Sequence, residues 1–146
     1  MDFASRYNRM VLKLLGRSLR RRDGSSERKI REAEKRLDIK LPLALREYHR
    51  VAGNLAELNK QHNQLLDLSD LVVEEGHLIF MHENQWVVSW GIRIEDLSCE
   101  DPAVWQRNNS EPIVWRAEEL TVSEFIAAML LWQSGVSEDE ARRSRF

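Results

Sequence analysis

The chain has one cysteine among its 146 residues and no long apolar run. A single cysteine excludes an internal disulfide framework and is typical of a reducing cytoplasm. No apolar segment approaches the roughly 20 residues that cross a bilayer. The opening stretch MDFASRYNRMVLKLLGRSLRRR does not resemble a signal peptide, because Arg9 and Lys13 interrupt its apolar part. We therefore expect a soluble, cytoplasmic protein.

Motifs of common catalytic and cofactor sites are also missing. The sequence contains no GxGxxG, no Walker-type GK[ST], no HExxH and no GxSxG. Cys99 would need a base beside it to act as a nucleophile, and its neighbours Glu100 and Asp101 disfavour the thiolate instead. We expect no catalytic residue and no cofactor, so the chain is predicted not to be an enzyme.

The four histidines do not form a metal-binding pattern. His77 and His82 are five residues apart on a predicted strand and its end, so they are expected to project to opposite faces. His49 and His62 have no partner at ligand spacing, and a lone cysteine cannot supply a thiolate cluster. No metal site is predicted.

The formal net charge of −2 conceals an uneven distribution. Residues 1–36 hold 12 Lys or Arg against 5 Asp or Glu, a net charge of +7, whereas residues 67–124 hold 3 against 13, a net charge of −10. Two interpretations fit this split. Either one part is functional, as a basic arm with its own partner or as an acidic body that faces a basic one, or both parts are solvated surface.

The first part of the chain has helical periodicity. An apolar face and Gly16 predict a helix that ends at about residue 16, and the basic stretch RSLRRRDGSS is interpreted as a mobile linker. Residues 1–26 are therefore assigned to a loosely held basic helix and its linker. Contact between the linker's arginines and phosphates is the alternative to a solvated segment. The predicted helix face consists of Phe3, Tyr7, Met10 and Leu14.

Two further helices are expected before residue 54. Ser25 or Ser26 can cap the first, and Pro42 suits the first turn of the second. Gly53 is expected to end the second helix in the left-handed conformation. Residues 55–66 permit one more short helix or an ordered loop. The predicted buried positions are Ile30, Ala33, Leu37, Leu45, Tyr48 and Ala52.

From about residue 70 the period changes to that of strands. HLIFMHE, QWVVSWGIRIED, AVWQR and PIVWRA are short apolar runs rich in β-favouring residues, and NNSEP is interpreted as a hairpin connection. Trp105 and Trp115 are expected in the core, with exposure as partner anchors as the alternative. The residues expected to share one apolar sheet face are Trp86, Val88, Trp90, Ile92 and Ile94.

The segment TVSEFIAAMLLWQSG predicts a closing helix, opened by a capping box of Thr121 and Glu124. Residues 136–146 are assigned to a C-terminal tail. This order of helices, strands and a helix predicts an α+β domain. Its mainly antiparallel sheet is expected to have about four to six strands, covered on one face by helices. The helix is expected to bury Phe125, Met129 and Trp132 and to end at Gly135, and Ser137 with Glu140 predicts one further turn.

Residues 31–54, REAEKRLDIKLPLALREYHRVAGN, resemble the opening motif of the SUKH superfamily, the Smi/Knr-type domain. The later strands and the closing helix follow that family's order, so the resemblance covers roughly residues 27–133. Residues 27–135 are accordingly assigned to a SUKH-like domain, and the basic N-terminal helix has no counterpart in it. The positions that match the motif are Glu34, Leu37, Leu41, Pro42, Leu45, Tyr48 and Gly53.

The resemblance implies a binding protein, because many bacterial members are immunity proteins thought to neutralise a cognate toxin, often a nuclease. A nuclease must be basic to hold phosphates, so an acidic surface would attract it. We therefore expect a protein partner rather than nucleic acid or a membrane. The alternative is a regulatory or scaffold domain whose basic N-terminal segment contacts nucleic acid or an acidic protein. The partner-binding residues predicted from charge and loop position are Glu74, Glu75, Glu83, Asp96, Glu100, Asp101 and Trp105.

Overall fold

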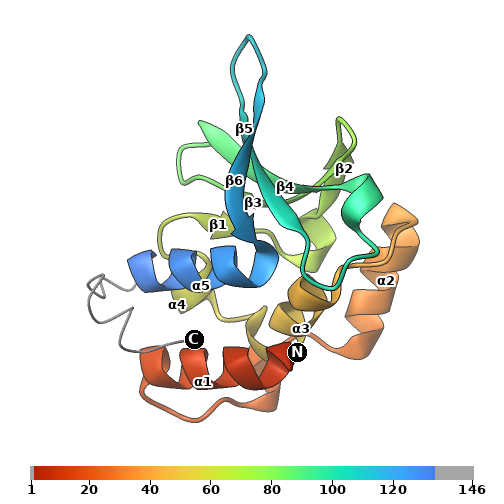
Figure 1. The fold of residues 1–146 in the computed structure, drawn as a ribbon. Coiled ribbons are helices and arrows are strands. Elements are labelled where there is room, and N and C mark those ends of the chain that lie inside the picture. Colours follow the sequence, from red (N-terminus) through yellow and green to blue (C-terminus); the bar gives the residue numbers. More distant parts are fainter. Residues whose placement is uncertain (1, 134–146) are drawn as a thin grey trace.

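The computed structural model describes residues 2–133 and has an α+β fold, in which helices pack against a six-stranded antiparallel sheet (Figure 1). The predicted fold class is therefore confirmed. The expected helix end at Gly135, the box of Ser137 and Glu140 and the tail over 136–146 lie outside the described residues. The helices are α1 (Phe3–Leu15), α2 (Glu27–Leu37), α3 (Leu43–Ala52), α4 (Ala56–Asn59) and α5 (Val122–Gln133). The strands are β1 (Gln64–Leu65), β2 (Val72–Glu74), β3 (His77–His82), β4 (Val88–Arg93), β5 (Ala103–Asn108) and β6 (Trp115–Thr121).

Helix α1 is part of the hydrophobic core rather than loosely held. Its residues Phe3, Tyr7, Met10 and Val11 are buried. The Tyr7 ring stands edge-on to that of Tyr48, with centroids 5.2 Å apart. The Tyr7 hydroxyl donates to the backbone carbonyl of Ala44 in α3 at 2.8 Å. The periodicity of the sequence identified the apolar face of this helix, but it could not identify the element that covers the face.

The basic segment after α1 is held in place, which corrects the expectation of a mobile linker. Arg17 pairs with Asp23 at 3.0 Å, and the same carboxylate accepts from the backbone N–H of Arg20 at 2.7 Å. Asn54 donates to two carbonyls of the segment, at 3.2 and 2.9 Å. At Gly24 an added Cβ would lie 1.7 Å from the carbonyl oxygen of Arg50, so only glycine fits where the segment crosses α3.

Local contacts fix the motif between α2 and α3, and the predicted serine cap is one of them. Ser26 caps α2 by accepting from a helix N–H at 3.2 Å, and Leu41 donates its N–H to Glu34 at 2.7 Å. Pro42 is the N-cap of α3, one residue before the first turn. Gly53 was predicted to be left-handed, but its φ is −61°. Glycine is required there because a Cβ would lie 2.7 Å from the carbonyl oxygen of residue 49.

The strands lie in the order β1-β3-β4-β5-β6, and β2 also pairs with β3. The β3–β4 register shifts between Ile79 and Met81, which is a β-bulge. Across this bulge His77 pairs with Arg93 and His82 with Ser89. Because the two partners are four residues apart on β4, the two histidines lie on the same face of the sheet. The predicted placement on opposite faces is therefore wrong.

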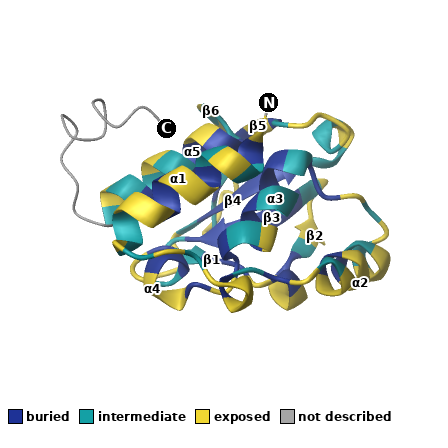
Figure 2. Cartoon of the chain, turned by 90° about the horizontal axis from the view of Figure 1, so that it is seen from below, coloured by how far each residue is buried: buried dark blue, intermediate teal, exposed yellow. Residues whose placement is uncertain are grey.

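Helices α1, α3 and α5 lie on one side of the sheet (Figures 1 and 2). Phe125 of α5 packs against Phe80 and Trp90, with ring centroids 5.9 and 5.2 Å apart. Trp132 was predicted to be buried with Phe125, but it is 59% exposed. The buried stripe of α5 follows Val122, Ile126 and Leu130 instead, so position 132 turns away from the sheet.

Candidate partner-binding surface

The second face of the sheet, which we term the outer face, points away from the helices. Trp90 packs on α5, so its neighbours Ser89 and Gly91 on β4 point the other way. Gly91 pairs with Ile79 and with Trp105, which places these residues on the same face. By the same register the outer face also carries His77, Arg93, Arg107 and Trp115.

Flat side chains stack across the outer face. The His77 ring lies parallel to Trp115, with centroids 3.6 Å apart and planes 5° apart. The Arg93 guanidinium lies 3.7 Å from the centre of the Trp105 ring. Gly91 makes room for this layer, because a Cβ there would lie 3.2 Å from that of His77. Trp105 and Trp115 are thus neither core residues nor free anchors: both are half-buried within the stacked layer.

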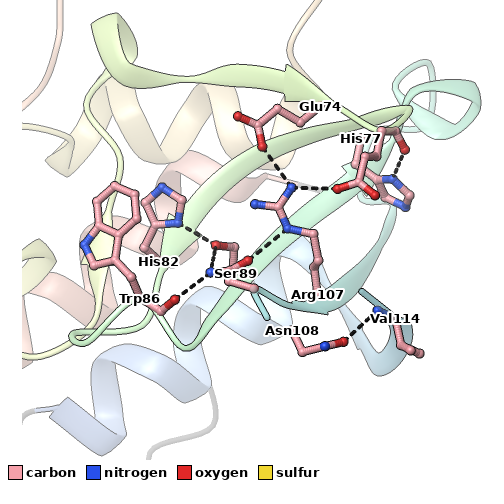
Figure 3. Close-up of polar contacts among 10 residues, drawn as sticks. Glu74, His77, His82, Trp86, Ser89, Arg107, Asn108 and Val114 are labelled. Carbon is pink, nitrogen blue, oxygen red and sulfur yellow. Dashed lines mark hydrogen bonds and ion pairs between the residues drawn. The ribbon is translucent and has the colours of Figure 1, made fainter. Parts of the chain in front are cut away.

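Arg107 is the centre of a polar network on the same face (Figure 3). Its Nη1 lies 2.8 Å from a carboxylate oxygen of Glu74 and 3.1 Å from one of Glu75. Its Nε donates to Asn109 at 3.0 Å. The guanidinium is largely buried, whereas the two carboxylates stay about half exposed, at 48% and 46%. The predicted pair Glu74 and Glu75 therefore has an internal partner that the charge pattern did not reveal.

A second part of the network holds the turn between β3 and β4. His82 Nδ1 is hydrogen-bonded to the hydroxyl of the buried Ser89 at 2.6 Å, and Asn109 donates to the same oxygen at 3.0 Å (Figure 3). Burial, with a smaller effect of Arg107, holds the pKa of His82 below its usual value. The His82 ring stacks on Trp86 at 3.9 Å. Trp86 was predicted to share the buried face with Trp90. It is 61% exposed, because it lies in the turn before β4 and not in the strand.

The other predicted acids differ in their roles. Glu83 accepts from the N–H groups of Gln85 and Val87, at 2.8 and 3.2 Å, and so shapes the β3–β4 turn. Asp101 accepts three hydrogen bonds from Thr121 and Ser123, at 2.6 to 2.9 Å, where α5 begins.

Asp96 and Glu100 lie in the loop that joins β4 to β5, and Glu100 is exposed. The backbone carbonyl of Glu100 accepts from the first turn of α3 at 2.8 Å, so the loop is anchored. The structure therefore brings Glu74 and Glu75 together, while Glu83 lies at the β3–β4 turn and Asp96 and Glu100 in a different loop. Sequence reasoning missed Arg107, His82, Ser89 and Asn109, because only the strand register brings them together.

Within residues 2–133 no cluster of three or more His, Cys, Asp or Glu is arranged to hold a metal ion. None of the helices in this part of the chain has the length and apolar character needed to span a membrane. A cleft of about 670 Å³ lies beside α2 and α4, and two of its cations, Arg36 and Lys60, are engaged by the chain itself. Arg36 donates to two backbone carbonyls at 2.9 and 3.0 Å, and Lys60 lies 3.6 Å from Asp67.

The chain matches no protein-family model, no curated protein and no solved structure.

Proposed function

We propose that the chain is a non-enzymatic binding protein, an immunity protein of the SUKH type that neutralises a cognate toxin through an acidic surface. The observation that carries the proposal is the outer face of the sheet. Among the described residues no helix covers this face. The exposed acids Glu74 and Glu75 lie at its margin, beside Arg107. A toxin that binds nucleic acid would offer the opposite charge.

The chemistry of the outer face favours a protein partner. Tryptophan and arginine are the side chains that most often dominate the energy of protein interfaces, and here both types are fixed by stacking. Fixed side chains lose little conformational entropy when a partner binds. The proposed contact set keeps Glu74, Glu75, Asp96, Glu100 and Trp105. Glu83 and Asp101 are not part of this set, because their carboxylates accept hydrogen bonds from the chain's own backbone.

The proposal predicts that this chain protects a cell from the toxin encoded beside it. The product of the neighbouring reading frame is expressed with and without this chain, and growth is measured. We expect the neighbour alone to stop growth, and co-expression to restore growth through a complex that co-purifies. A neighbour that is harmless, or toxicity that persists at full expression of a folded chain, would contradict the proposal.

One observation favours the second candidate, a regulatory domain that contacts nucleic acid. The exposed arginines Arg20, Arg21 and Arg22 border a groove of about 830 Å³ together with Arg50. If this groove binds phosphates, the full chain should bind duplex DNA or RNA with an affinity that falls steeply with salt. Absence of binding at low salt removes this candidate.

A further inference from the structure

The turn between β3 and β4 presents a large aromatic side chain to solvent in an unusual backbone conformation. Trp86 is 61% exposed and the adjacent Val87 is 56% exposed. The φ of Trp86 is +62°, a region that bulky residues rarely adopt. A strained backbone at an exposed tryptophan persists only where the surroundings enforce it, and such positions concentrate at functional sites.

The surroundings of Trp86 do enforce this conformation. Its N–H donates to the carbonyl of Glu83 at 2.9 Å, and its own carbonyl accepts from the side chain of Asn109 at 2.8 Å. The backbone N–H of Asn109 donates to Val87 at 2.9 Å. The turn is therefore hydrogen-bonded both to its own start and to the end of β5. Because the turn is already ordered, it loses little conformational entropy when a partner binds.

The indole ring has one packed face. His82, which is 7% exposed, stacks on it with centroids 3.9 Å apart and planes 23° apart. Ser89 fixes the imidazole in turn, through the bond to Nδ1 at 2.6 Å. The ring thus has a defined orientation on a rigid base, although most of its surface is in contact with water.

The neighbouring hairpin extends this apolar region and adds charge. Ile113 and Val114, between β5 and β6, are 41% and 42% exposed. They are joined to the turn through the end of β5, because Asn108 donates to Val114 at 3.2 Å and the next residue donates to Val87. Glu111 is exposed in this hairpin and Glu83 lies at the start of the turn. An exposed apolar group bordered by carboxylates fits a partner of matching character.

We propose that Trp86 is the anchor residue of the partner interface, and that it enters an apolar cleft bordered by lysine or arginine side chains on a protein toxin. Val87 and Ile113 flank the anchor, and exposed Glu111 faces the basic border of the cleft. The inference rests on the proposed function and names the part of the surface that supplies most of the binding energy.

The test compares two tryptophans with the same exposure and similar neighbours. Trp132 on α5 is 59% exposed and also contacts a histidine ring, that of His62, at 4.8 Å. Trp86→Ala, Trp132→Ala and the wild-type chain are titrated with the purified toxin from the neighbouring reading frame, made catalytically inactive. We expect Trp86→Ala to raise the Kd by roughly 30-fold or more, and Trp132→Ala by less than about 3-fold.

A third variant separates binding from folding. Glycine adopts a positive φ without strain, so Trp86→Gly should unfold at a denaturant midpoint no lower than that of Trp86→Ala while it loses the same affinity. If the wild-type chain does not bind the toxin, the proposed function fails and the anchor fails with it. If the wild-type chain binds and Trp86→Ala or Trp86→Gly binds equally well, only the anchor is overturned.

Discussion

His49 is a neutral imidazole enclosed in the core. It is fully buried, and neither ring nitrogen has a hydrogen-bond partner among the described residues. Burial lowers the pKa of His49 to about 4, against a smaller opposite effect of Asp67. Gly53 closes over this ring, since a Cβ at that position would lie 2.9 Å from Nδ1. This contact adds to the clash with the carbonyl oxygen of residue 49 that already requires glycine at position 53.

This residue makes stability depend on pH in a defined window. In the unfolded chain His49 takes up its proton near pH 6.5, and in the folded protein only near pH 4. The contribution of His49 to the free energy of unfolding is therefore constant above pH 6.5. It is lost as the pH falls from 6.5 to 4, by about 3 kcal/mol in total. Urea unfolding at pH 7, 5 and 4 measures the free energy of unfolding. We expect His49→Leu to lack this part of its decrease at low pH.

Exposed His62 supplies the control, because His62→Leu makes the same substitution at a histidine that the core does not enclose. Comparison of the two variants separates the effect of enclosing a histidine in the core from that of merely replacing a histidine by leucine. Equal pH dependence in wild type and His49→Leu would show that the imidazole is not enclosed as described.

At the scale of elements, local sequence predicted the ends of helices well. Ser26 caps α2, Gly16 ends α1 with a φ of +68°, and the box of Thr121 with Glu124 opens α5 with bonds of 3.0 and 3.5 Å. These contacts span three or four residues, which is why they can be predicted without a fold. The third acceptor at α5, Asp101, lies 20 residues from Thr121 and was interpreted as a binding residue instead.

The hydrogen bonds of Asp101 at the start of α5 predict that this residue stabilises the fold. Asp101→Ala removes three hydrogen bonds at the start of α5, and it should lower the free energy of unfolding by about 1–2 kcal/mol. Glu100→Ala, at the exposed neighbouring position, should change it by less than about 0.5 kcal/mol. Denaturant unfolding of both variants measures this, and equal stability of the two would contradict the role given to Asp101.

The strand register was the part of the sheet that sequence could not supply. Alternation predicted buried Trp90 and Ile92 correctly, but the bulge in β3 moved His82 to the face of His77, and the strand began only after Trp86. A bulge depends on the pairing of two strands and leaves little trace in the pattern of one. The stacked layer and the network around Arg107 follow from that register, so they were beyond prediction.

At the scale of the whole molecule, the order of elements predicted the α+β class because each layer needs an apolar partner. The place of α1 was not predictable, since its apolar face would suit several partners equally well. The charge division of the sequence corresponds to structure: the basic N-terminal part carries α1 and α2, whereas residues 67–124 carry most of the sheet. The proposed function requires that this acidic half contacts a partner.

Charge reversal on the β4–β5 loop tests whether the acidic surface binds the partner. Asp96→Lys with Glu100→Lys leaves Asp101 and its cap intact, and Glu32→Lys with Glu57→Lys makes the same charge change at exposed sites on α2 and α4. The rate constant for association with the inactivated toxin is measured at low and high salt. We predict at least a 10-fold slower association at low salt for the loop variant alone, with the difference shrinking as salt rises. Equal rates for the two variants would contradict the claim that Asp96 and Glu100 belong to the acidic partner-binding surface.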